Sequence, residues 1–70
     1  MKLKVGNTVS YTHSNGYIGA AVIESIEICS PGDKYGRVAT QCDTNNAIEG
    51  VVCLSDHHWC YFDQINEVLS

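Results

Sequence analysis

Hydrophobic and polar residues alternate along several short stretches of the chain. The stretches are residues 5–11, 18–28, 37–42, 48–54 and 59–62. A period of two places every second side chain on the same face of an extended strand. The pattern therefore predicts a chain built from about five short β-strands, with turn-forming residues between them.

Four clusters of turn-forming residues separate these stretches. They lie at residues 14–16, 30–33, 43–46 and 55–57. The first cluster contains an Asn-Gly pair, which is favoured in tight β-hairpins because both residues tolerate a positive φ. The second has Pro and Gly in the order of a β-turn. Turns at this spacing are typical of an all-β sandwich or barrel.

The longest alternating stretch covers residues 18–28. The residues that share its phase are Ile18, Ala20, Val22, Ile26 and Ile28. Glu24 interrupts the series, so we expect a long strand with a bulge or bend near this residue. A helix over residues 19–28 is the competing interpretation, because Ile18, Val22 and Ile26 are four positions apart. The β-branched content and the sustained alternation favour the strand.

The C-terminal stretch predicts three short elements in succession. Residues 59–62 indicate an aromatic-rich strand, residues 63–65 a single helical turn, and residues 66–69 a last strand. A chain of 70 residues forms one domain, residues 1–70, with a small core. Five strands in so short a chain can curl into one small barrel, which limits exposed edges. We therefore expect an all-β fold.

Several segments resemble parts of SH3-like barrels. Residues 59–68 (WCYFDQINEV) resemble the ending of these domains, and residues 4–9 (KVGNTV) resemble their common V-G-D-x-V opening. Residues 17–20 and 35–38 look like their second and third strands. The resemblance implies a small five-stranded SH3-like barrel with a single 3-10 turn before the last strand. Small stand-alone chains of this kind also resemble proteins carried by phages and mobile bacterial elements.

One group within this superfamily is an enzyme. The type II dihydrofolate reductases are short SH3-like barrels that assemble as tetramers around a pore, and their active-site strand reads Val-Gln-Ile-Tyr. The corresponding stretch here is Trp59-Cys60-Tyr61-Phe62, which lacks the Gln-Ile pair before the tyrosine. Because the residues that would carry this activity are missing, we predict that the chain is not an enzyme and has no catalytic residues. An oligomeric enzyme for a small substrate is kept as a further alternative.

The charge balance argues against nucleic acid as a partner. Four basic residues stand against eight acidic ones, which gives a formal net charge of −4, and both kinds are dispersed along the chain. Non-specific binding to a phosphate backbone or an anionic membrane depends on clustered cations. A nucleic-acid or nucleotide reader that uses aromatic stacking is therefore the second hypothesis rather than the first.

The features of a secreted or membrane-bound protein are missing from the sequence. No apolar signal-peptide core follows the first lysines, no stretch approaches the roughly 20 apolar residues of a membrane span, and no Asn-x-Ser/Thr site occurs. We expect a cytoplasmic protein. Its four cysteines are then expected to be free thiols that pack as small hydrophobic residues, since disulfides are rare in reducing compartments.

Four potential metal ligands lie close together in the sequence. They are Cys53, His57, His58 and Cys60. A zinc site here needs the two cysteines to face each other across a hairpin and a histidine to fold over them. The Cys-x-x-Cys spacing of zinc knuckles is absent. We therefore predict packed thiols and exposed turn histidines, with no metal and no cofactor.

Aromatic residues gather at the predicted strand ends and beside the turns. The predicted binding residues are Tyr17, Tyr35, His57, Trp59 and Tyr61. Tyr and Trp offer a large contact area and a polar tip at low entropy cost, which suits interfaces. The expected partner is a protein or peptide, and an exposed strand edge could also support a homodimer or larger homo-oligomer. In the alternative arrangement, Trp59 and Tyr61 plug the ends of the barrel.

Overall fold

The structure is a computed structural model that describes residues 1–29, 36–45 and 49–70. Its elements in chain order are β1 (Lys2–Lys4), β2 (Thr8–Thr12), β3 (Ile18–Cys29), β4 (Arg37–Ala39), β5 (Gln41–Asp43), β6 (Glu49–Leu54), β7 (Trp59–Tyr61), the 3-10 turn η1 (Phe62–Gln64) and β8 (Ile65–Val68). The predicted all-β class is confirmed. The described residues contain no α-helix, and so none that is long and apolar enough to cross a membrane. The predicted turn at residues 30–33 and the predicted binding residue Tyr35 lie outside the described residues.

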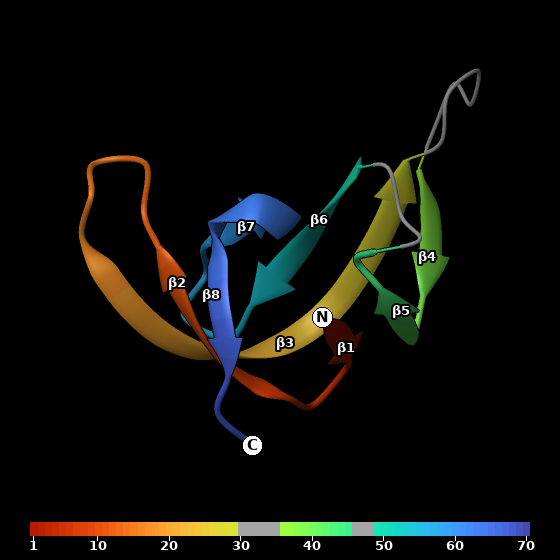
Figure 1. The fold of residues 1–70 in the computed structure, drawn as a ribbon, viewed down its shortest axis with the longest axis horizontal. Coiled ribbons are helices and arrows are strands. Elements are labelled where there is room, and N and C mark those ends of the chain that lie inside the picture. The colour runs from red at the N-terminus through yellow and green to blue at the C-terminus, as the bar shows by residue number, and fades with distance from the viewer. Residues whose placement is uncertain (30–35, 46–48) are drawn as a thin grey trace.

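The strands form two antiparallel sheets (Figure 1). The larger sheet has the order β7-β6-β3-β2-β8, with β4 attached to β3, and the smaller one pairs β1 with β5. β3 is the central strand, because β2, β6 and β4 all pair with it. Figure 1 shows it as a long curved strand that runs from the turn after β2 to β4. Among the described residues no ladder joins β7 to β8, so the larger sheet is open at these strands.

The chain contains more and shorter strands than the alternation predicts. Eight rather than five occur in the described residues. The predicted strand over residues 5–11 is wrong at its start, because residues 5–7 form a turn between β1 and β2 that places Gly6 at a φ of +99°. The side chain of Asn7 closes this turn, since its Oδ1 accepts from the backbone N–H of Lys4 at 2.7 Å. A second division at Thr40 separates β4 from β5, and these two strands pair with different neighbours.

β3 confirms the prediction of a long strand with an irregularity near Glu24. Its pairing with β6 shifts register between Ile23 and Ser25, so Glu24 is an extra residue in the ladder. The register shift changes which side chains face inward. Ile23 is buried before the shift and Ile26 after it, and these residues are three positions apart, so they would face opposite sides of a regular strand. The single phase that we expected along the whole stretch is therefore wrong for the first half of β3. The exposed residues of that phase are Ile18, Ala20 and Val22.

The core is small and mainly aliphatic. Its buried residues are Leu3, Val9, Tyr11, Ala21, Ile23, Ile26, Val52, Leu54, Cys60 and Ile65. Most of them come from β2, β3 and β6, where every second side chain points inward. Tyr11 is the largest fully buried side chain. The core therefore depends on one aromatic ring that also carries a polar group.

The C-terminal elements match the prediction, with β7, the single turn η1 and β8 in succession. The side chain of Gln64 holds the turn in place. Its Oε1 accepts from the backbone N–H of Tyr61 at 2.9 Å, and its Nε2 donates to the carbonyl of Thr12 at 3.0 Å. Gln64 thereby ties η1 and the end of β7 to the end of β2.

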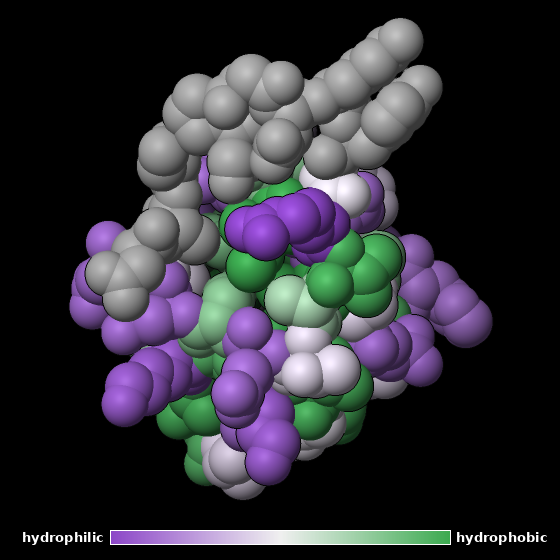
Figure 2. Space-filling view, turned by 90° about the vertical axis from the view of Figure 1, so that its right-hand side faces the viewer, coloured by the Kyte–Doolittle hydropathy of each residue, from purple (hydrophilic) through white to green (hydrophobic). Residues whose placement is uncertain are grey.

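β4 lies at one side of the larger sheet. Figure 2, which looks onto this side, shows hydrophobic side chains between hydrophilic ones. Val38, the central residue of β4, is 82% exposed. Self-association through a strand edge stays a prediction, and size-exclusion chromatography measures it.

We predict that Ile23→Ala and Ile18→Ala differ strongly in stability, although both remove the same atoms from β3. Ile23 is fully buried, so its truncation should lower the free energy of unfolding by about 2–4 kcal/mol. Ile18 is 64% exposed, so its truncation should cost less than about 1 kcal/mol, mainly through lost β-propensity. Urea denaturation of both variants measures the difference. Equal costs, or a larger cost at Ile18, contradict the inward phase of the first half of β3.

Candidate functional site

A cleft of about 570 Å³ lies where two turns and the C-terminal elements meet. One wall is the β2–β3 turn (residues 13–17), and another is the β6–β7 turn (residues 55–58). The remaining walls come from β7 and η1. The lining residues that matter for its chemistry are Tyr11, His13, His57, His58, Trp59 and Tyr61. The cleft therefore combines predicted binding residues with a group of titratable side chains.

The β2–β3 turn forms at the Asn-Gly pair, as the sequence predicts. The backbone N–H of His13 donates to the Tyr17 carbonyl at 2.6 Å, and the Gly16 N–H donates to the His13 carbonyl at 2.9 Å. Gly16 has a φ of +88°, which side-chain-bearing residues adopt only with strain. The Oδ1 of Asn15 accepts from the Tyr17 N–H at 3.0 Å. His13 is held over Gly19, where an added Cβ would lie 3.0 Å from the imidazole Nε2.

The β6–β7 turn is closed by its own aspartate. The Oδ1 of Asp56 accepts from the backbone N–H of His58 at 3.1 Å, and the Leu54 N–H donates to the His58 carbonyl at 2.8 Å. His57 has a φ of +69°, and among the described residues it is the one non-glycine residue with a positive φ. This conformation is uncommon for residues with a Cβ. The tight turn places Asp56 and His58 side by side.

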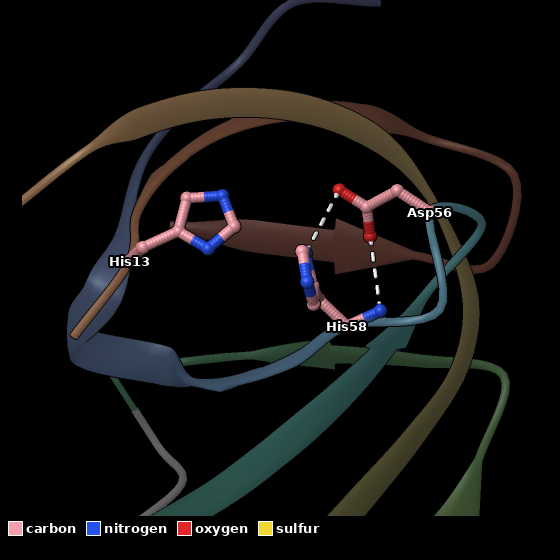
Figure 3. Close-up of side chains that lie close together, drawn as sticks. All are labelled: His13, Asp56 and His58. Atoms are coloured by element: carbon pink, nitrogen blue, oxygen red, sulfur yellow. Dashed lines mark hydrogen bonds and ion pairs between the residues drawn. The ribbon is translucent and has the colours of Figure 1, made fainter. Parts of the chain in front are cut away.

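The hydroxyl of Tyr11 links the two turns. Its ring is buried, and its hydroxyl donates to the Oδ2 of Asp56. The Nδ1 of His58 lies 3.3 Å from the Tyr11 hydroxyl and 3.6 Å from the Asp56 Oδ2. The ring centroid of His13 lies 4.6 Å from that of Tyr11 and 4.7 Å from that of His58. Figure 3 shows the His58 ring between His13 and Asp56, so the three side chains from two turns form one cluster.

Burial and hydrogen bonding fix the protonation of the Tyr11–Asp56 pair. Burial raises the pKa of the Tyr11 phenol, and the neighbouring Asp56 carboxylate raises it further. Burial also acts to raise the pKa of the Asp56 carboxyl. The hydrogen bonds from the Tyr11 hydroxyl and the His58 N–H outweigh that effect, so the pKa of Asp56 is lowered overall. At neutral pH a neutral phenol therefore donates to an ionised carboxylate.

The four ligands considered from the sequence do not converge. In the β6–β7 ladder Cys53 pairs with Trp59 rather than with Cys60, and alternation places the two thiols on opposite faces. Cys60 is buried, and burial, helped by two nearby carboxylates, raises its pKa to about 11. Cys53 is exposed, so the expectation that it packs as a small hydrophobic residue is wrong. His57 and His58 are exposed, as predicted.

Four of the predicted binding residues are exposed in or beside the cleft. Trp59 is 58% and Tyr61 46% exposed, and their ring centroids lie 5.3 Å apart at an interplanar angle of 86°. The alternative in which these two rings plug the fold is therefore wrong. His57 lines the same cleft. Tyr17 is 67% exposed and adjoins the cleft through His13, whose ring centroid lies 5.3 Å from its own.

The predicted binding residues did not include Asp56, Tyr11 and His13. Asp56 lies far from the other two along the chain, and the pairing of β2 and β6 with β3 brings them together. One signal was present, because Tyr11 and His13 are two positions apart and so share a face of an extended strand. A histidine on the inward phase just before an Asn-Gly turn predicts an imidazole at the end of the sheet.

Comparison of the chain with models of protein families, with curated proteins and with solved structures finds no match. Its function must therefore be inferred from the geometry of the cleft.

We predict that Tyr11→Phe lowers the free energy of unfolding by about 1–2 kcal/mol, because the Asp56 carboxylate loses a hydrogen-bond donor. Tyr17→Phe is the matched control, since the Tyr17 ring is exposed, and it should change stability by no more than about 0.5 kcal/mol. Chemical denaturation at neutral pH measures both. A Tyr11→Phe variant as stable as the natural protein contradicts the link between the two turns.

We also expect the two cysteines of the β6–β7 ladder to react very differently with an alkylating reagent at neutral pH. Cys53 is exposed and should be modified in the folded protein. Cys60 is 1% exposed and its pKa is raised to about 11, so almost no accessible thiolate forms. Mass spectrometry of peptides from timed reactions measures the order, and urea should make the two rates similar. Early modification of Cys60 contradicts its inward orientation.

Proposed function

We propose that this chain is an SH3-like barrel that works as a small binding module and captures an extended segment of a partner protein in the cleft. The succession of β7, η1 and β8 supports the class, since a 3-10 turn before the last strand is the feature on which the resemblance rests. The antiparallel order of short strands around the long, bent β3 is also compatible with it.

The exposure of Trp59 and Tyr61 is the observation that carries the proposal. Both rings leave much of their apolar area exposed to water. They do not contribute to the core, in which Tyr11 is the one aromatic side chain among the described residues. The two rings pack edge to face and together present one apolar surface. Exposed aromatic residues grouped in a cleft are typical of binding surfaces, where Trp and Tyr carry much of the affinity.

The polar groups of the cleft favour an extended segment as the occupant. A polyproline-II segment has no internal hydrogen bonds, and its backbone groups can pair with polar side chains while its prolines pack against aromatic rings. The cleft is lined by such polar side chains at Ser14 and Asn15 as well as by the rings of Trp59 and Tyr61. We therefore propose a proline-containing segment as the ligand.

The charge of the cleft supports a peptide over a nucleic acid. The described residues that line it include no lysine or arginine, and the Asp56 carboxylate lies beside it, 3.6 Å from the Nδ1 of the lining residue His58. A phosphate backbone would meet no counter-charge there, whereas a peptide without acidic residues meets no repulsion.

The titratable groups also support a non-enzymatic role. The buried Cys60 thiol and the Tyr11 phenol both have raised pKa values, so both are poor nucleophiles at neutral pH.

The proposal predicts that a proline-containing peptide selected against the protein from a displayed library loses at least tenfold in affinity on Trp59→Ala or Tyr61→Ala. Fluorescence anisotropy of the labelled peptide measures the affinity, and circular dichroism checks that each variant is folded. Val38→Ala is the control, because Val38 is as exposed as the cleft rings but lies on β4.

Selected peptides that bind both cleft variants and the natural protein equally contradict the proposal, as does a failure to select any. A parallel titration with single-stranded oligonucleotides at low salt tests the second hypothesis. Oligonucleotide binding that depends on Trp59 would replace the peptide by a stacked base as the occupant of the cleft.

A further inference from the structure

We propose that His13, Asp56 and His58 bind one divalent transition-metal ion at the inner end of the cleft, and that Zn²⁺ is the ion that fits best. The site is distinct in chemistry from the aromatic surface. It needs no peptide, and it would exist even if the binding function proposed above were wrong.

The spacing of the donor atoms is the first argument. One nitrogen of each histidine and one carboxylate oxygen of Asp56 lie within 4.8 Å of one another. The Asp56 Oδ2 and the His58 Nδ1 are already 3.6 Å apart. In a tetrahedral zinc site with bonds of about 2.0–2.1 Å, neighbouring donor atoms lie about 3.4 Å apart. Small side-chain rotations of His13 therefore suffice to close the site around an ion.

The orientation of the carboxylate is the second argument. The Asp56 Oδ1 accepts from the His58 N–H, and the Oδ2 accepts from the Tyr11 hydroxyl. Carboxylate ligands of metals are commonly held by such outer hydrogen bonds, which fix their direction before the ion arrives. The Oδ2 keeps a free lone pair, because a carboxylate oxygen can accept more than one bond. Tyr11 therefore acts as a positioning residue, and its neutral phenol is not a ligand.

The donor set selects the class of ion. Two imidazoles and one carboxylate suit Zn²⁺ and its first-row neighbours, whereas Ca²⁺ and Mg²⁺ require mainly oxygen ligands. Three protein ligands leave at least one position of the ion open to the cleft, where water or a ligand can complete the coordination. Among the residues that the structure describes, none that lines the cleft is a lysine or arginine that would repel a cation.

The test is calorimetric titration of the full chain with ZnCl2, after removal of adventitious metal and in the presence of a phosphine reductant. We expect one ion per chain with an affinity in the micromolar range or tighter. The melting temperature should rise by about 10 °C when free zinc exceeds the dissociation constant a hundredfold. His13→Gln and His58→Gln should each weaken binding at least tenfold.

The chain provides two matched controls. His57→Gln removes the neighbouring imidazole of the same turn, and Cys53→Ser removes the exposed thiol, and both should leave zinc binding unchanged. Imidazole NMR signals of His13 and His58 should shift on zinc addition while those of His57 do not. This measurement keeps the proposal testable if a substituted variant fails to fold.

Three results would overturn the metal site. They are no binding at submillimolar zinc, unchanged affinity in folded His13→Gln and His58→Gln variants, and loss of binding in Cys53→Ser, which would assign the ion to a thiolate. Failure of the peptide proposal is separate, because Trp59→Ala should abolish peptide capture and leave the zinc titration intact. A variant that loses both would show that the substitution damages the whole cleft.

Discussion

The buried hydroxyl of Tyr11 is the constraint on which the cleft depends. A small all-β core needs one large side chain to fill its middle, and here that side chain carries an oxygen. A buried hydroxyl without a partner would cost about 1–3 kcal/mol. Asp56 supplies the partner from the β6–β7 turn, so satisfying one atom of the core also fixes a loop at the surface. His58 and Trp59 follow Asp56 closely in the chain, so fixing Asp56 also positions their side chains.

The bulge at Glu24 lies in β3, the central strand of the larger sheet. β3 pairs with β2 in its first half and mainly with β6 and β4 in its second half. In a regular strand of this length, the same alternate side chains would face inward from end to end. The sheet would then stay flatter than the packing of a small core requires. One extra residue exchanges the inward phase between Ile23 and Ile26. The cleft lies between the turns that follow β2 and β6.

The sequence was sufficient for those parts of the fold that depend on local patterns. The alternation predicted the all-β class, the Asn-Gly pair predicted the β2–β3 turn, and the residues after Tyr61 predicted the 3-10 turn. Glu24 marked the irregularity of β3 but not which face each half presents, because apolar residues occupy both phases before it. The exposed rings of the site were predicted from their places beside turns.

The His13–Asp56–His58 cluster was not predictable in the same way, because its members meet only through the pairing of three strands. Periodicity reports which side of a strand a residue faces and not which distant turn lies opposite. The alternative metal site at Cys53, His57, His58 and Cys60 does not form for the same reason, because residues that are close in sequence are separated by the β6–β7 ladder, which turns Cys60 inward.

The small core also connects the proposed metal site with the aromatic surface of the same cleft. Ten hydrophobic side chains are buried among the residues that the structure describes, and so small a core leaves a 70-residue chain with little stability to spare. An ion held by His13 and Asp56 would cross-link segments that are distant in the chain, and binding free energy of this kind adds directly to the stability of the folded state. The same cross-link would restrict the two turns that form the walls of the cleft, and a pre-ordered cleft loses less entropy when it takes up an extended segment. The two proposals together imply that metal binding and peptide binding would favour each other, with the coupling carried by the order of the β2–β3 and β6–β7 turns.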